Sequence, residues 1–312
     1  MRHYQVLDIN KISFSTFLNI TIFVKNFKQH KMKVTIFYST LLSLLCLLSL
    51  FSCKGHRSVD TPNEIAFDTI NAVRIYHLDN DSTKPSCSLK INYIYPSAYT
   101  DEVVLAKMQS ELNLMLFEDE TLEKATPIEA VNEYINAYIE NYKSEAKSRF
   151  PDWEESEQTE DYFSFYKKID TEILFDKGDI LSYQASSLDD KGGAHSSSLY
   201  VYMVFDVNTG KVLTEDDIFA ISYQEKLNTI LKAYVVKQKN AKSIEELADL
   251  GYIGIEDLSS NNNFFVNEKG ISYIFNSGEY SAPSIGAIKV DLPYEEIKFL
   301  LKQDSPISHL YN

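Results

Sequence analysis

The sequence has few of the residue types on which enzyme and metal sites commonly depend. Its 312 residues include three cysteines, Cys46, Cys53 and Cys87, and only Cys87 lies in the body of the chain beyond residue 64. A single cysteine has no partner, so an internal disulfide framework is excluded there. No base or metal ligand lies beside Cys87 in the sequence, and we interpret it as a small buried apolar residue.

Histidines are equally scarce, and only four follow residue 53: His56, His77, His195 and His309. This number and spacing argue against a three-histidine metal site, and no cysteine pair has zinc-ligand spacing. The phosphate-binding patterns G-x-x-x-x-G-K-[ST] and G-x-G-x-x-G are missing, as is the G-x-S-x-G turn of serine hydrolases. We therefore expect no cofactor and no metal.

Basic residues are also few relative to acidic ones. The chain has 30 lysines and arginines against 45 aspartates and glutamates, which gives a formal net charge of −15. The acidic surplus grows further when the mainly basic first 52 residues are set aside. Such a surface repels nucleic acid phosphates, which excludes nucleic acid as a partner, and it suits cationic partners.

One apolar run near the N-terminus predicts how the chain is targeted. Lys33 is followed by uncharged residues from Val34 to Ser52, and Cys53 ends the run directly after the small residue Ser52. This order is typical of a bacterial lipoprotein signal peptide over residues 32–52, with lipid attached to Cys53. The alternative is an ordinary transmembrane helix, because the run is nearly long enough to span a bilayer.

The lipoprotein interpretation divides the N-terminal part of the chain. Met32 is a natural start, so we interpret residues 1–31 as an over-called start, with a real extension as the alternative. Residues 53–64 are polar and predict a short tether to the membrane. The expected location is the bacterial cell envelope, lipid-anchored in the outer membrane with a periplasmic or surface face, since several acyl chains anchor a protein stably.

The remaining chain predicts an α+β fold. The 21 tyrosines and 18 phenylalanines favour pleated surfaces. Alternation of apolar residues predicts an antiparallel or mixed sheet with hairpins, and apolar spacing of three and four predicts helices packed on one side. An acidic stretch at 152–161 suggests a boundary between an N-terminal module, 65–160, and a C-terminal domain, 161–312.

Individual elements follow from the same patterns. Strands are expected over 67–95, 162–175, 179–188, 197–207, 211–214, 264–276 and 284–293. Helices are expected from a Thr100 cap over 101–117, from Thr126 to 150, over 222–239 and 243–250, and from Pro293 to about 302, with a short capped helix after Thr214.

His195 is the main candidate for catalysis, since the adjacent carboxylate pairs, Asp216/Asp217, Glu154/Glu155 and Glu295/Glu296, do not establish two carboxyl groups across a cleft. It follows Gly192, Gly193 and Ala194, and three serines follow it directly. Neighbours along a strand point to opposite faces, so a dyad of His195 with Ser196 is not the natural geometry. A neutral histidine beside two glycines more often braces a loop through hydrogen bonds. We therefore predict no catalytic residue and no enzyme activity.

The segment from residue 192 to residue 219 resembles the signature of the RsiV-like family. It reads GGAH, a strand, then FDVNTGKVLTEDDIF, so that Gly192, Gly193, Ala194, His195, Phe205, Asp206, Gly210, Asp217 and Phe219 match the family pattern. A hairpin and a proline-containing loop over 264–297 are similar to the family's closing segment. The chain departs from the pattern at Asp190 and Lys191, where the family usually has tyrosine and threonine.

The resemblance implies a non-catalytic extracytoplasmic domain with an RsiV/PdaC-like fold. Such a region is the lysozyme-binding sensor of an anti-sigma factor and accompanies a separate deacetylase domain in PdaC. We therefore expect a lipid-anchored envelope protein that recognises lysozyme or peptidoglycan fragments, with the signature residues in a structural or binding role. The alternatives are an envelope polysaccharide hydrolase or deacetylase centred on His195, and a structural lipoprotein without a small ligand.

Overall fold

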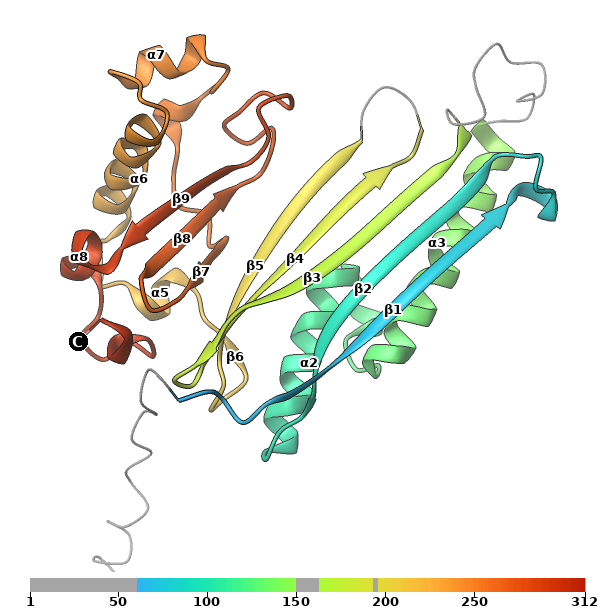
Figure 1. The fold of residues 1–312 in the computed structure, drawn as a ribbon, viewed down its shortest axis with the longest axis horizontal. Helices are drawn as coiled ribbons and strands as arrows, with labels where there is room; N and C mark the ends of the chain where they lie inside the picture. The colour runs from blue at the N-terminus through green and yellow to red at the C-terminus, as the bar shows by residue number, and fades with distance from the viewer. Residues whose placement is uncertain (1–60, 150–162, 193–195, 312) are drawn as a thin grey trace, which may run out of the picture. The chain divides into compact units, whose positions relative to one another are not determined.

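The computed structural model describes residues 61–149, 163–192 and 196–311. These residues lie within one compact unit, His56–Asn312, and form two β-sheets with helices, as Figure 1 shows. The α+β prediction, with hairpins and a mixed sheet, is therefore confirmed. The predictions for residues 1–60, for the 152–161 boundary and for residues 193–195 concern residues outside those that the structure describes.

The larger sheet has six strands in the order β1-β2-β3-β4-β5-β6. Their bounds are β1 Ala66–His77, β2 Ser86–Ala98, β3 Phe165–Lys177, β4 Ile180–Asp190, β5 Ser197–Asp206 and β6 Lys211–Val212. All neighbours pair antiparallel except β2 and β3, which run parallel. Strands from both sides of residue 160 thus share one sheet, and the division at that residue stays a prediction.

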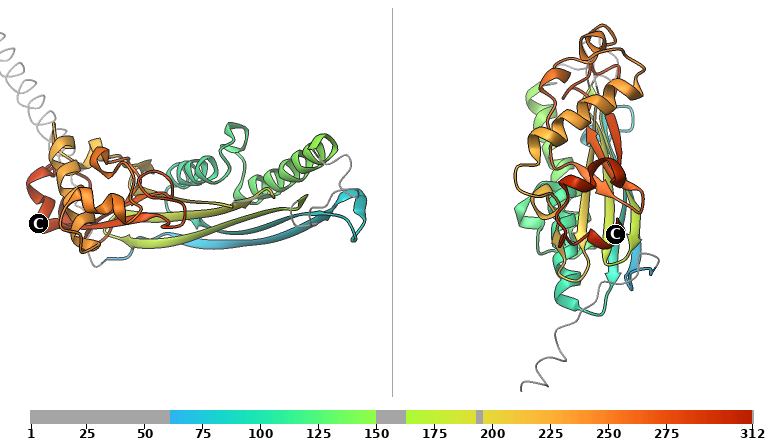
Figure 2. Two further views of the ribbon diagram at one scale, coloured as in Figure 1. Left: turned by 90° about the horizontal axis from the view of Figure 1, so that it is seen from above. Right: turned by 90° about the vertical axis from the view of Figure 1, so that its left-hand side faces the viewer.

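Two helices make the crossover between the parallel strands β2 and β3. They are α2, Glu102–Phe117, and α3, Pro127–Arg149, and both lie on the same face of the sheet (Figure 2). The N-cap of α2 is Asp101 and not Thr100, because the Asp101 carboxylate accepts hydrogen bonds from the backbone N–H groups of Val103 and Val104. Thr126 and Glu129 form a reciprocal cap at the start of α3.

The core beneath these helices is rich in aromatic residues. Tyr93, Tyr142, Phe165 and Tyr183 are fully buried there. Asn113 of α2 is buried in the same core, and its amide donates to the carbonyl oxygens of Leu122 and Ala125 at 3.1 and 2.9 Å. It thereby satisfies the loop backbone between α2 and α3, which includes the 3₁₀ turn η3, Glu120–Leu122.

The smaller sheet has the order β7-β8-β9 and is antiparallel throughout. Its strands are β7 Phe264–Val266, β8 Gly270–Phe275 and β9 Ile288–Pro293, and α6, Gln224–Gln238, packs on it. Short helices complete this part: α5 Glu215–Ile218, α7 Ile244–Asp249 and α8 Tyr294–Ile297. The helix expected from Pro293 to about 302 is shorter, since α8 passes directly into the 3₁₀ turn η6, Lys298–Leu300. Further 3₁₀ turns are η2 Leu78–Asn80, η5 Ile255–Asp257 and η7 Ser308–Leu310.

The two sheets are joined by buried contacts. Phe175, Ile180 and Val204 of the larger sheet belong to the same apolar core as β7, β8 and β9. The Ser182 hydroxyl donates to the Val266 carbonyl oxygen at 2.7 Å and accepts from the Val266 N–H at 3.2 Å. A side chain of β4 thus satisfies both backbone groups of a β7 residue, so the smaller sheet is held in register with the larger one.

Candidate functional site

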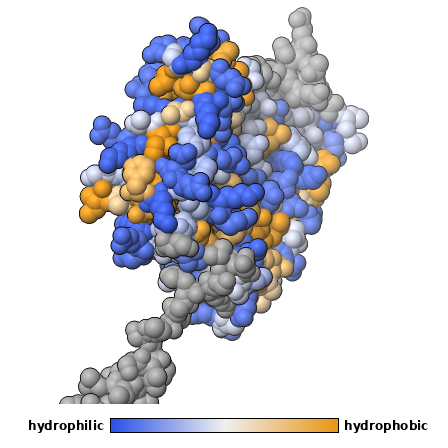
Figure 3. Space-filling model, turned by 60° about the vertical axis from the view of Figure 1, so that its left-hand side comes forward, coloured by the Kyte–Doolittle hydropathy of each residue, from blue (hydrophilic) through white to orange (hydrophobic). Residues whose placement is uncertain are grey.

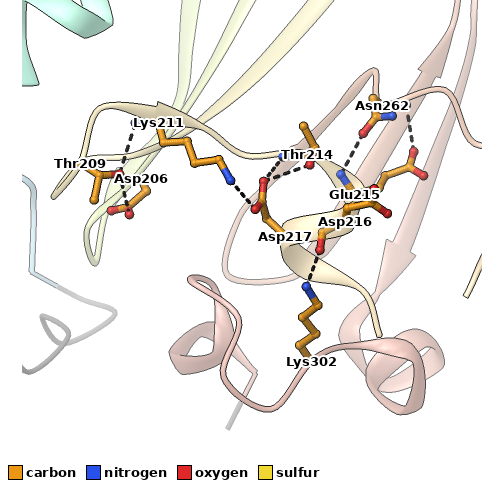
Figure 4. A network of polar contacts seen from close by, with 9 residues as sticks. All are labelled: Asp206, Thr209, Lys211, Thr214, Glu215, Asp216, Asp217, Asn262 and Lys302. Carbon is orange, nitrogen blue, oxygen red and sulfur yellow. Dashed lines mark hydrogen bonds and ion pairs between the residues drawn. The ribbon is translucent and has the colours of Figure 1, made fainter. Parts of the chain in front are cut away.

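The signature residues from Phe205 to Phe219 form a polar network at the end of β5 (Figure 4). The Asp206 carboxylate accepts from the Asn208 N–H at 2.9 Å and from the Thr209 hydroxyl at 2.9 Å. The Gly210 N–H donates to the Asp206 carbonyl oxygen at 2.8 Å, and Gly210 has φ +64. These bonds close the turn that returns the chain as β6, which explains the Asp-x-x-Thr-Gly spacing.

Asp217 completes the next part of the network. Its carboxylate accepts from the Thr214 N–H and hydroxyl, both at 2.9 Å, and forms an ion pair with Lys211. Burial acts to raise the pKa of Asp217, but the hydrogen bonds from Lys211 and Thr214 outweigh it and hold that pKa below its ordinary value. The predicted capping box at the start of α5 is present.

Glu215 is the buried centre of this region and was not singled out from the sequence. It is 2% exposed, and its carboxylate accepts from the Asn262 N–H at 2.8 Å, the Ser260 hydroxyl at 2.7 Å and the Tyr223 hydroxyl at 2.9 Å. The Asn262 side chain accepts from the Glu215 N–H at 2.8 Å in return. A carboxylate with this many donors holds the segment before β7 against α5.

The apolar residues of the signature are buried. Phe205 and Phe219 are at most 1% exposed, and they lie in the two different apolar cores. The apolar signature residues after residue 204 are thus buried, and the polar ones are hydrogen-bonded. A structural role is therefore sufficient to explain each of them. The network connects the end of the larger sheet to the helices of the smaller one.

The first part of the signature is only partly described. Gly192 has φ +73, and its N–H donates to the Asp190 carboxylate at 3.0 Å. Gly193, Ala194 and His195 lie outside the described residues, as does Cys53. Cys87 is fully buried, and burial raises the pKa of its thiol to about 12, which is unsuited to nucleophilic chemistry.

The outer edge of β5 is capped by asparagine side chains. The Tyr200 N–H donates to the Asn276 side-chain oxygen at 2.7 Å, and the Tyr202 N–H donates to the Asn263 side-chain oxygen at 2.8 Å. Both asparagine amides donate to the Tyr200 carbonyl oxygen, at 3.0 and 2.9 Å. These amides take the place of a neighbouring strand, and their capping ends before Ser198.

A groove of about 880 Å³ opens at this end of β5. One wall is the start of β5, and the other is the loop between β8 and β9. Its lining consists of small, hydroxyl-bearing and cyclic residues: Ser196, Ser197, Ser198, Tyr200, Ser277, Pro283, Ser284, Gly286 and Ala287. The groove directly follows the GGAH motif in the sequence, and none of the lining residues that the structure describes carries a carboxylate, imidazole, thiol or amine.

Two other hollows are smaller. One, of about 380 Å³, lies against β8 and β9, where Lys289 and Asp291 pair with each other at 3.0 Å. The other, of about 90 Å³, lies between the end of α2 and strands β3 to β5 and is below the usual size of ligand pockets, about 300–1,000 Å³. The groove at β5 is larger than either of these hollows and adjoins the signature segment, so we take it as the candidate binding site.

The loop that forms the second wall of the groove was missed by sequence reasoning as a site. Its residues were assigned to a loop and a late strand, and the signal was its content of small residues in NSGEYSAPSIGA.

Among the described residues, no group of three or more histidine, cysteine, aspartate or glutamate side chains is placed to hold a metal ion. None of the described helices has the length and apolar character needed to cross a bilayer.

The fold and this network define a two-sheet α+β domain, and comparisons with known proteins agree. Residues 216–295 match the family described as "Protein of unknown function (DUF3298)". A crystal structure of a DUF3298 family member from Bacteroides fragilis is similar, with a TM-score of 0.75 and 25% identity over 80% of this chain and 99% of that chain. A DUF3298 family protein from Pseudomonas aeruginosa shares the fold at a TM-score of 0.56 and 10% identity, over 80% and 98% of the two chains. Curated protein sequences include no match.

Proposed function

We propose that this chain is a non-catalytic, lipid-anchored binding protein of the bacterial cell envelope, and that its ligand is a peptidoglycan-derived glycan held in the groove at β5. The observation that carries the proposal is the groove itself, with five serines and a tyrosine among the nine described residues that line it. Hydroxyl groups exchange hydrogen bonds with sugar hydroxyls in either direction, and the Tyr200 ring offers an apolar surface to a sugar face.

The same lining supports binding in preference to hydrolysis. A glycoside hydrolase needs two carboxyl groups on opposite sides of the scissile bond, and a deacetylase needs a base or a metal. The described lining supplies neither. The resemblance to the RsiV-like signature points in the same direction, because it implies a recognition domain.

A groove-filling substitution tests this proposal. Residues 56–312, the compact unit, are titrated with muropeptides and N-acetylglucosamine oligomers by calorimetry. Ser284 is exposed in the groove, and Ser144 is exposed on α3, remote in sequence from the lining. Ser284→Trp weakens glycan binding by at least about tenfold, which is the loss expected when a bulky ring occupies a binding pocket, whereas Ser144→Trp has no effect. If Ser284→Trp leaves the glycan affinity unchanged, the groove is not the glycan-binding site.

Lysozyme is the second candidate partner, and the charge of the chain favours it. A net charge of −15 attracts a cationic protein, and Figure 3 shows hydrophilic residues over much of one face, with hydrophobic residues between them. Lysozyme binding of this origin weakens steeply between 50 and 300 mM salt, and Ser284→Trp leaves it unchanged. If neither lysozyme nor any glycan binds at micromolar concentration, both partners are wrong.

The anchor needs a separate experiment. Cells that express the full chain are labelled with a fatty acid, and the protein incorporates label on Cys53. Cys53→Ser abolishes labelling and releases the protein from the membrane fraction, because acyl chains provide the attachment. A labelled Cys53→Ser variant, or an unlabelled wild-type protein retained in the membrane, contradicts the lipoprotein assignment and favours a transmembrane helix.

A further inference from the structure

The larger sheet has one long edge without a partner among the described residues. Strand β1, Ala66–His77, has 12 residues and pairs along its whole length with β2 on one side only. Figure 1 shows β1 as the outermost strand of this sheet. A typical strand has about five or six residues, so β1 presents an unusually long row of backbone donors and acceptors.

Some of the devices that usually protect such an edge are missing from β1, although its two charged residues bond to neighbouring backbone groups. Asp68 accepts from the Thr69 N–H at 2.7 Å, and Arg74 donates to the Val73 carbonyl oxygen at 2.9 Å, so pairing with another strand exchanges these bonds for bonds between strands. The sequence of β1, AFDTINAVRIYH, has no proline and no lysine, and the irregularity in its pairing lies at the start, between Ala66 and Phe67. Two large apolar side chains, Val73 and Ile75, are 57% and 61% exposed. The opposite edge of the same sheet is treated differently, since β6 and the Asn263 and Asn276 amides cap β5.

The sequence of β1 is complementary to itself. When two β1 strands pair antiparallel about a two-fold axis at Asn71, Asp68 lies opposite Arg74 of the partner subunit, and the pair occurs twice. Both residues are exposed, and both lie on the same face of the strand because they are an even number of positions apart. Opposite charges that face each other across paired strands stabilise the pairing.

The same register also covers apolar surface. It places Val73 opposite Thr69 of the partner subunit and Ile75 opposite Phe67 of the partner subunit. Val73 and Ile75 lie on one face of the strand and are exposed in the single chain, whereas Phe67 is half-buried and also contacts the core beneath α2 and α3. The pairing therefore satisfies the backbone edge, places two ion pairs and shields exposed side chains at once.

We propose that two copies of this chain associate through β1, antiparallel about an axis at Asn71, so that their larger sheets form one continuous sheet. The association is independent of the groove at β5, which lies at the other edge of the sheet. It makes β1 a self-recognition surface.

Charge reversal tests the register. Analytical ultracentrifugation of residues 56–312 shows a dimer for the wild type at tens of micromolar. Arg74→Asp places like charges opposite each other at both symmetric positions and raises the dimer Kd by at least about tenfold. The double variant Asp68→Arg with Arg74→Asp restores the attraction and returns the Kd to near the wild-type value. A wild type that stays monomeric at 0.5 mM, or a double variant as weak as Arg74→Asp, overturns the proposal; circular dichroism confirms that each variant is folded.

Disulfide trapping tests the axis. In Asn71→Cys, the two introduced thiols lie opposite each other on the axis, so mild oxidation gives a covalent dimer. Lys226→Cys, exposed on α6, is the matched control and gives little. Cys87, the remaining cysteine of residues 56–312, is fully buried and contributes no background. Equal cross-linking of the two variants, or none in either, overturns the proposal.

Discussion

The backbone carbonyl oxygen of Val104 lies 3.0 Å from the position that a Cβ atom at Gly210 would occupy. Gly210 ends the turn between β5 and β6, and Val104 belongs to the first turn of α2, so the signature turn is docked on a helix from the other half of the chain. The Lys107 side chain donates to the Thr209 carbonyl oxygen at 3.5 Å beside this contact. The glycine of the signature is thus a packing requirement between α2 and the end of the sheet.

Gly210→Ala lowers the free energy of unfolding for two reasons. The new Cβ atom would lie too close to the Val104 carbonyl oxygen, and the positive φ of Gly210 is unfavourable for a residue with a side chain. We expect a loss of about 2–3 kcal/mol, combining a positive φ with the contact to Val104. Gly254→Ala is the matched control: its φ is +73 and nothing lies within 4 Å, so about 1 kcal/mol is expected from the backbone angle alone. Urea unfolding of both variants measures the difference, and equal losses contradict the packing argument.

Ser182→Ala removes the side-chain link between the two sheets. The Val266 N–H and carbonyl oxygen then remain buried without the hydroxyl that satisfies them, and a loss of about 2 kcal/mol follows. Ser197→Ala, at an exposed position of β5, is the control and leaves stability within about 0.5 kcal/mol. A Ser182 variant as stable as the control would show that water or local adjustment replaces the link.

The acid dependence of stability has a contribution from Asp217. Burial opposes the charged form, but Lys211 and Thr214 stabilise it more, so the pKa of Asp217 is lower in the folded than in the unfolded chain. This contribution is fully present above the unfolded pKa, about 4, and is lost as pH falls through the folded pKa. The stability difference between wild type and Asp217→Asn is therefore largest near pH 7 and shrinks below pH 4. A difference that stays constant from pH 7 to pH 2.5 contradicts this assignment.

The non-catalytic proposal predicts the behaviour of His195→Ala. Incubation of purified peptidoglycan with residues 56–312 releases no reducing ends and no acetate above background, and the variant behaves identically. Glycan affinity and melting temperature are measured in parallel to separate binding from folding. Turnover by the wild type that His195→Ala abolishes, without a change in melting temperature, reinstates the hydrolase or deacetylase alternative.

Local patterns predicted most elements of the fold because they depend on neighbouring residues. The alternation in LKINYIYP predicted β2, and the Thr126–Pro127 start predicted α3. The capping box at Thr214 followed from a spacing of three residues, and the short helix α5 is present as expected. The cap of α2 was misplaced by one residue because Thr100 and Asp101 are both good caps, and only the backbone geometry distinguishes them.

Long-range contacts were beyond sequence reasoning. Nothing in the sequence distinguishes three polar residues, Asn113, Glu215 and Asn263, from other polar residues. Yet each of them forms hydrogen bonds with backbone groups that lie 9 to 63 positions away in the chain. The groove combines the start of β5 with a loop about 80 residues later, so no local pattern predicts it. For the same reason, the parallel pairing of β2 with β3 could not be predicted, since it depends on how the two helices cross the sheet.

The parallel pairing of β2 with β3 has a consequence for any attempt to divide this protein. Residues 161–312 expressed alone would lack β2, which pairs with β3, and would expose the aromatic residues of the core beneath the sheet. We therefore expect this piece to aggregate. Two separately made pieces, 56–160 and 161–312, should instead find each other and reassemble. We therefore expect both pieces to be needed together for the larger sheet to form.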